Sequence, residues 1–120
     1  CWQSQPKDCL VGGVIRYPDG RFQQVGVRVN LWTASSKGYS LDAANRLDRL
    51  DSLSGACMLV PRAVFDCIGL LPEHYFLYFE DVAFCLAARE AGFSCKVALN
   101  ATIYHAMGEC TNAIPEQRSY

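Results

Sequence analysis

Residues 75–86 read YFLYFEDVAFCL, which places two adjacent carboxylates, Glu80 and Asp81, between an aromatic run and a predicted helix. Unpaired N–H groups and the positive end of the helix dipole favour acidic side chains in a first helical turn. Position alone therefore gives the pair a structural explanation. An ionised carboxylate within reach of a hydroxyl is also a competent general base, and the aromatic run can exclude water or stack on a sugar ring. Both interpretations stay open at this point.

The residues after Asp81 have the apolar spacing of an amphipathic helix. We expect this helix to begin near Glu80 and to stop at Gly92. Its predicted buried face comprises Val82, Cys85 and Leu86. Residues 93–99 are then predicted to form a strand, and residues 102–105 a separate short one.

Upstream of the acidic pair, residues 56–60 form a continuous apolar run, which is typical of a strand covered on both faces. Pro61 fits the first turn of a helix, and Gly69 can take the positive φ that ends one. The apolar face of this predicted helix comprises Val64, Phe65 and Ile68. The sequence therefore predicts a strand followed closely by a helix.

The N-terminal part of the chain predicts a β-hairpin, because residues 12–17 and 21–25 flank the turn-forming residues 18–20, Pro-Asp-Gly. Patterning is poor from residue 30 to residue 53: residues 35–38 resemble a loop, and residues 41–53 suit a short helix or a strand. Strands that alternate with helices indicate an α/β fold, with a mixed sheet, one hairpin and two main helices.

Composition excludes several classes of protein. A chain of 120 residues with 51% hydrophobic residues is expected to form one domain. The net charge of −1 and the scattered lysines and arginines argue against a nucleic-acid partner. No apolar run reaches the roughly 18 residues of a membrane-spanning helix, and the first residues lack the pattern of a signal peptide. We therefore expect a soluble cytoplasmic protein.

The seven cysteines include no pair with C-x-x-C spacing, so a zinc or redox site gains little support. Most are expected to be small buried hydrophobic residues in a reducing compartment. His105 lies on a strand-like segment, where a lone histidine is more often a satisfied polar group than a ligand. A zinc hydrolase that uses cysteines and His105 stays an alternative with little support from spacing.

Four segments together carry a resemblance to a known family. They are residues 11–20 with Val25-Gly26, residues 54–62, residues 69–93 with Glu80-Asp81, and Tyr104-His105. Each alone is weak, but their order and approximate spacing resemble the family 2 glycosyltransferases, inverting enzymes of the GT-A fold, and specifically their rhamnosyltransferase-like branch. The resemblance covers nearly the whole chain.

The resemblance implies roles for individual residues. Asp81 matches the catalytic base that deprotonates the acceptor hydroxyl, with Glu80 beside it as an acceptor-site or supporting residue. His105 matches a histidine that helps to hold the divalent metal, Mg²⁺ or Mn²⁺, on the donor diphosphate. The implied substrate-binding residues on the acceptor side are Ser54, Gly55, Ala56 and Tyr78. The implied partners are a nucleotide-sugar donor and a glycan or lipid-linked acceptor.

The chain also departs from the family pattern. Ala83 and Ala87 stand where members often carry Asp and Arg, and Pro72-Glu73 stands where they often show Asp-Glu. The nucleotide-binding half, with its Asp-x-Asp metal motif, is expected before Val11 and only a few residues are there. We therefore expect residues 1–120 to be the acceptor-side C-terminal half of the enzyme, a fragment that binds no metal and is inactive alone.

Two further expectations follow from a half-fold. An uncovered sheet edge and apolar surface favour self-association, so a homo-oligomer is predicted. The alternative to a transferase fragment is a non-catalytic binding or self-assembly module derived from the same fold. Peripheral association with the inner membrane is the alternative to a purely cytoplasmic location.

Overall fold

The computed structural model describes residues 8–33, 35–74 and 79–106, so the predicted substrate-binding Tyr78 lies outside the described residues. The elements follow in the order β1 (Cys9–Arg16), β2 (Phe22–Gln24), β3 (Val27–Asn30), β4 (Ser35–Gly38), α1 (Leu41–Arg46), β5 (Met58–Leu59), α2 (Arg62–Ile68), α3 (Glu80–Glu90) and β6 (Ser94–Tyr104). The main sheet contains both parallel and antiparallel pairs. The predicted α/β fold with a mixed sheet is therefore confirmed.

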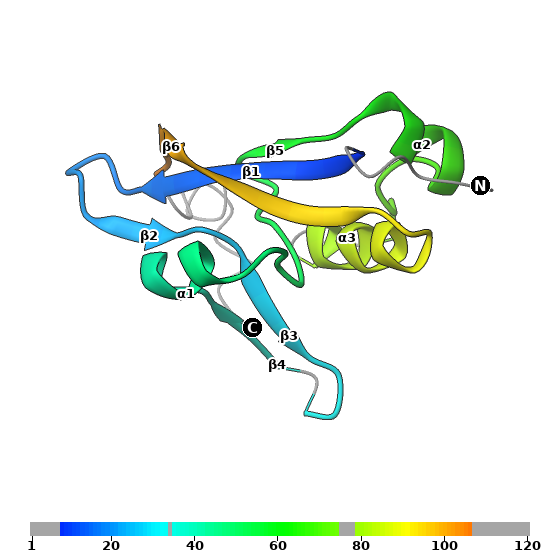
Figure 1. The fold of residues 1–120 in the computed structure, drawn as a ribbon, viewed down its shortest axis with the longest axis horizontal. Helices are drawn as coiled ribbons and strands as arrows, with labels where there is room; N and C mark the ends of the chain where they lie inside the picture. Colours follow the sequence, from blue (N-terminus) through cyan, green and yellow to red (C-terminus); the bar gives the residue numbers. More distant parts are fainter. Residues whose placement is uncertain (1–7, 34, 75–78, 107–120) are drawn as a thin grey trace.

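Strand β1 is the centre of the main sheet (Figure 1). It runs parallel to β6 along its whole length, and it pairs antiparallel with β5 near its start and with β2 at its end. The β1–β6 register jumps between Gly13, opposite Ala98, and Val14, opposite Thr102. The two strands predicted over residues 93–99 and 102–105 are therefore one strand, because β6 bulges between them and then continues on β1.

The predicted hairpin is confirmed, with β1 and β2 joined through a tight turn in which the Gly20 N–H donates to the Tyr17 carbonyl at 2.8 Å. The prediction of a loop over residues 35–38 is wrong. These residues form β4, which pairs antiparallel with β3 from Val27↔Gly38 to Asn30↔Ser35. Backbone pairing holds this polar, fully exposed strand, so its side chains carry no strand pattern. The β3–β4 hairpin extends away from the main sheet (Figure 1).

The strand predicted over residues 56–60 is shorter and more exposed than expected. Only Met58–Leu59 pairs with β1, opposite Val11 and Gly12, and 72% of Leu59 is exposed. The expectation of a strand covered on both faces is therefore wrong, because two paired residues at one end of β1 leave the outer side chain in solvent. Helix α2 follows Pro61 directly and ends at Gly69 with φ 82°, close to the predicted bounds.

Helix α3 begins at Glu80, as predicted, and packs against α2 and β6. Its fully buried residues are Phe84, Cys85 and Ala88, whereas Val82 and Leu86 are half-buried. The buried face is thus rotated from the predicted one, because the Phe84 ring meets the Phe65 ring of α2 at a centroid distance of 5.6 Å. This packing fixes the direction of α3 and, with it, the position of the acidic pair.

The described cysteines differ in their environments. Cys85 and Cys95 are buried free thiols, as expected, and Cys9 and Cys57 are free and half-buried. Cys67 is disulfide-bonded, which the expectation of a reducing compartment did not anticipate. No described helix is long and apolar enough to cross a membrane.

Candidate functional site

The acidic pair follows a residue with an unusual backbone conformation. Phe79 caps α3 with φ 66° and ψ −10°, the left-handed region, and no side chain hydrogen-bonds as an N-cap. A non-glycine residue in this region costs roughly 1–2 kcal/mol. The chain accepts this strain immediately before Glu80 and Asp81, at the start of α3.

The structure brings two predicted site segments together. The Asp81 carboxylate accepts the Gly55 N–H at 2.8 Å through Oδ2 and the Val82 N–H at 2.8 Å through Oδ1. The first bond joins residues 26 positions apart, and the second satisfies one of the free N–H groups at the start of α3. Asp81 is therefore held by backbone donors on both of its oxygens.

The segment from Ser54 to Ala56 forms a tight turn opposite Asp81. The Cys57 N–H donates to the Ser54 carbonyl at 3.1 Å, and the Ala56 N–H lies 3.3 Å from the Ser54 hydroxyl oxygen. Gly55 and Ala56 are exposed, so this turn lies at the surface. A Cβ at Gly55 would lie 3.5 Å from the Asp81 carboxylate, an ordinary contact. The turn and the carboxylate are thus close enough to form one surface site.

Glu80 is held differently from Asp81. Its Oε2 atom is buried and has no hydrogen-bond partner among the described residues. A buried carboxylate oxygen without a partner is costly. Within the acidic pair, the described contacts therefore hold Asp81 at the surface turn, and they leave one oxygen of Glu80 inside the protein.

His105 lies apart from these contacts. Its backbone N–H donates to the Arg16 carbonyl at 2.8 Å, which extends the β1–β6 ladder, and its ring Nδ1 lies 3.1 Å from Gln23 Oε1. It makes no hydrogen bond to Glu80 or Asp81 within the described part of the chain. Over the same residues, no three His, Cys, Asp or Glu side chains gather as a metal site. The described residues alone do not fit a divalent metal, which prefers several oxygen ligands.

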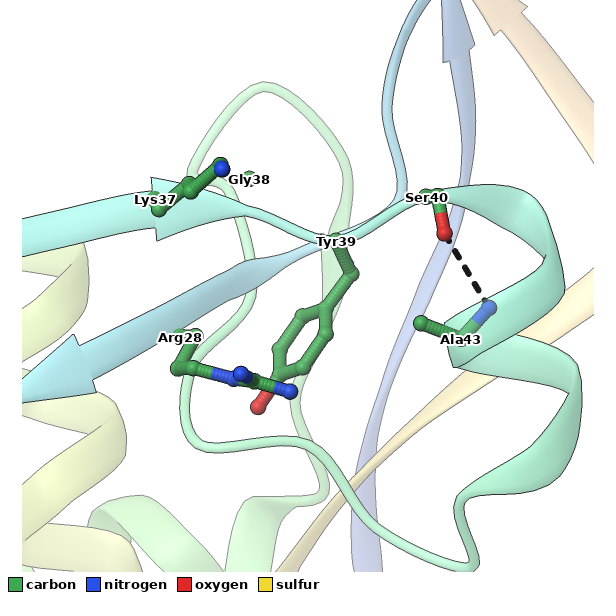
Figure 2. A pocket seen from close by; sticks show the side chains of 6 residues that line it. All are labelled: Arg28, Lys37, Gly38, Tyr39, Ser40 and Ala43. Atoms are coloured by element: carbon green, nitrogen blue, oxygen red, sulfur yellow. Dashed lines mark hydrogen bonds between the residues drawn. The ribbon is translucent and has the colours of Figure 1, made fainter.

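A separate pocket of about 260 Å³ lies at the base of the β3–β4 hairpin (Figure 2). Its lining residues are Arg28, Lys37, Gly38, Tyr39, Ser40 and Ala43. None of the predicted site residues lines it, and the sequence analysis missed it. The sequence gives only a weak signal for this pocket, because its two cationic residues, Arg28 and Lys37, lie nine positions apart in a segment without clear periodicity.

The mixed α/β architecture, with an acidic pair opening a helix beside a surface turn, is consistent with a partial GT-A fold. The family described as "Glycosyltransferase like family 2" matches residues 16–119. The chain therefore belongs to the glycosyltransferase family 2-like proteins, as its sequence resemblance indicated.

Three curated relatives show how this chain compares with longer proteins. An uncharacterized protein, y4gI, of Sinorhizobium fredii is 32% identical over 79% of this chain and 12% of its own length. The low-salt glycan biosynthesis hexosyltransferase Agl10 of Haloferax volcanii is 40% identical over 38% of this chain and 15% of its own. The N-acetylglucosaminyl-diphospho-decaprenol L-rhamnosyltransferase of Mycobacterium tuberculosis is 31% identical over 72% of this chain and 27% of its own. The chain thus spans a minor part of each relative. No solved structure matches it.

Proposed function

We propose that this chain forms the acceptor side of an inverting glycosyltransferase, with Asp81 as the general base. The observation that carries the proposal is the Asp81 carboxylate, which Gly55 and Val82 hold through two backbone N–H groups at 2.8 Å. Those residues come from two segments that the family resemblance assigns to one site. Each carboxylate oxygen keeps a lone pair for a substrate hydroxyl, because a carboxylate can accept about four hydrogen bonds.

The proposed reaction uses Asp81 for a single proton transfer. The carboxylate takes the proton of an acceptor hydroxyl while that oxygen forms a bond to the anomeric carbon of the donor sugar. The bond from this carbon to the nucleotide diphosphate breaks, and the diphosphate leaves with the electron pair. Attack opposite the leaving group inverts the anomeric centre. A positioned base contributes typically 10²–10⁴-fold to such a step.

The other assigned residues have supporting roles in this proposal. Ser54, Gly55 and Ala56 form the turn that holds the base and borders the acceptor, and Glu80 supports the start of α3. The metal role of His105 stays a prediction, which Mn²⁺ titration of the wild-type protein and of His105→Ala would test. The described residues do not by themselves fit a metal, so the proposed roles are those of the side chains and backbone groups alone.

The proposed substrates are a nucleotide-sugar and a glycan or lipid-linked acceptor. Their support is the family match and the printed names of two relatives, a rhamnosyltransferase that acts on a diphospho-decaprenol compound and a glycan hexosyltransferase. Because the chain covers no more than 27% of these relatives, the activity of the whole protein belongs to the proposal. Two further parts of the proposal are that the chain is a fragment inactive alone and that it is cytoplasmic.

Replacement of Asp81 by Asn tests the base. The amide oxygen of Asn can still accept one of the two backbone N–H groups, but it cannot take a proton. We expect kcat to fall at least about a hundredfold in the longest reading frame that carries these residues. Donor affinity, measured by calorimetry, should stay unchanged.

Asp66→Asn is the matched control, because Asp66 is an exposed helical carboxylate whose described partner is Arg62 at 3.4 Å. It should leave both kcat and donor affinity unchanged. Turnover that survives in Asp81→Asn removes the base assignment. A drop in melting temperature large enough to explain the lost turnover would assign Asp81 a structural role instead.

A further inference from the structure

The tip of the β3–β4 hairpin exposes two large apolar side chains. Trp32 is 99% exposed and Leu31 is 74% exposed. The Asn30 side chain accepts the backbone N–H groups of Trp32 and Thr33 at 3.0 and 3.2 Å, so two hydrogen bonds hold the backbone at these two residues. Tryptophan has an apolar body with one polar N–H group, and it concentrates at membrane–water interfaces for this reason.

The stem of the hairpin carries two cations directly opposite each other. Arg28 on β3 is the register partner of Lys37 on β4, so the two side chains share one face of the hairpin. Like charges in this position are destabilising. Residues 27–38 include no Asp or Glu that could offset the repulsion. An anionic partner placed against this face would offset it.

The pocket at the base of the hairpin gathers donors suited to a phosphate group. The Arg28 guanidinium lies over the Tyr39 ring, 5.4 Å from its centroid, and Lys37 lines the same pocket (Figure 2). Two acidic residues of adjoining segments have other partners: Asp42 pairs with Arg46 at 2.8 Å, and Asp51 accepts the Val29 N–H and lies 3.5 Å from Arg89. Neither carboxylate makes a described ion pair with Arg28 or Lys37.

The apolar tip and the cations are spaced for a lipid surface. Arg28 and Lys37 lie two residues behind the strand ends Asn30 and Ser35, which is about 7 Å at a rise of roughly 3.3 Å per residue. Interfacial elements bury their apolar face about 5–10 Å into the boundary between headgroups and acyl chains. When the tip enters that boundary, the two cations reach the level of the headgroup phosphates.

We propose that the β3–β4 hairpin docks this protein onto a bilayer that contains anionic phospholipid. Leu31 and Trp32 enter the interface, and the pocket between Arg28 and Lys37 takes a headgroup phosphate. The proposal rests on the hairpin alone, and it holds whether or not Asp81 is a catalytic base. A transferase docked in this way would be held beside a lipid-linked acceptor.

Tryptophan fluorescence tests the docking directly. The chain has two tryptophans, so Trp2→Phe leaves Trp32 as the single reporter. We mix this variant with vesicles of phosphatidylcholine, with or without phosphatidylglycerol. We expect a blue shift of Trp32 emission, together with co-sedimentation of the protein, for the anionic vesicles. Added salt should reverse both changes, because the attraction is screened.

Matched variants separate the two parts of the surface. The double variant Leu31→Ser and Trp32→Ser should bind the anionic vesicles at least tenfold more weakly. Leu70→Ser should bind like wild type, because Leu70 is equally exposed (76%) but lies at the end of α2. Lys37→Gln should weaken binding roughly fivefold, about the contribution of one cation near an anionic surface.

Three results would overturn the proposal. One is a Trp32 emission maximum that does not shift to shorter wavelength when anionic vesicles are added. Another is equal co-sedimentation of wild type and the double tip variant. The third is a blue shift that needs no vesicles and grows with protein concentration, since it would show that a second copy of the chain covers the tip.

Discussion

Phe79 combines backbone strain with a position next to the proposed base, Asp81. Its φ of 66° is unfavourable for any residue with a Cβ, and its side chain is 58% exposed, so little packing is gained in return. Strained backbone persists where the surrounding structure determines it, and it clusters at functional sites. Here it immediately precedes the acidic pair, which is why we connect the strain with the placement of Asp81.

We expect Phe79→Gly to be more stable than Phe79→Ala by about 1 kcal/mol, because glycine adopts a positive φ without the Cβ clash. Both variants remove the ring, so their difference isolates the backbone. Leu47 supplies the control pair, since its φ of −100° should make glycine less stable than alanine. Urea denaturation measures both differences. The same order of stability at both positions would contradict the argument.

At the scale of elements, the sequence predicts the turns and helix ends that depend on residues close together in the chain. The Pro18–Gly20 turn, the start of α3 at Glu80 and the end of α2 at Gly69 each depend on residues within a few positions of one another. Strand β4 was missed because its polar residues become a strand only by pairing with β3. Strand β5 is shorter and more exposed than predicted. An apolar run in the sequence does not show how many of its residues will pair with a neighbouring strand.

In the candidate site, too, local features could be predicted from the sequence and long-range contacts could not. The identities of Glu80, Asp81 and His105 could be read from motif order, but their contacts could not. The bond from Gly55 to Asp81 spans 26 positions, and no local rule predicts it. The bond from His105 to Gln23 also depends on how the main sheet assembles. Tyr78 lies outside the described residues, and its role stays a prediction.

The packing of α3 on β6 buries two thiols against each other. The hydrogen bond between them raises the pKa of the Cys95 thiol far above its ordinary value of 9.0, with burial adding to the rise, and it lowers the pKa of the Cys85 thiol to about 7. The folded pair therefore releases one proton early and keeps the other, whereas above about pH 9 the unfolded chain has released both. Because the folded state then binds more protons, stability must fall as the pH rises.

We expect Cys95→Ala to lose less of its unfolding free energy between pH 9 and pH 11 than wild type does. The absolute stability of the variant will be lower, since it leaves a cavity, so the comparison concerns the slope with pH. Urea denaturation at each pH gives this slope. Identical slopes would show that Cys95 ionises equally in both states.

At the scale of the whole molecule, we expect the outer edge of the main sheet to favour self-association. Strand β6 has β1 on one side, and on the other side the described chain supplies the bridge from Leu50 to Cys95. Beyond this bridge the described residues place no further strand beside β6, and Tyr104 at its end is 66% exposed. Open strand edges promote pairing with another chain.

We therefore expect sedimentation velocity to show concentration-dependent self-association. Tyr104→Lys should weaken it, because a charge on an edge strand disfavours pairing. Leu70→Lys is the control, since it adds the same charge at an exposed apolar position away from that edge. A single monomeric species at all concentrations would contradict the expectation of a homo-oligomer.

The bond between Gly55 and Asp81 also bears on how this site can change during evolution. The donor is a backbone N–H, which every residue except proline supplies, and a Cβ at position 55 would meet Asp81 at an ordinary 3.5 Å. Val82 likewise contributes its backbone to the Asp81 carboxylate. The two bonds that fix Asp81 are thus insensitive to most substitutions around it, so neighbouring side chains can diverge while the carboxylate keeps its place.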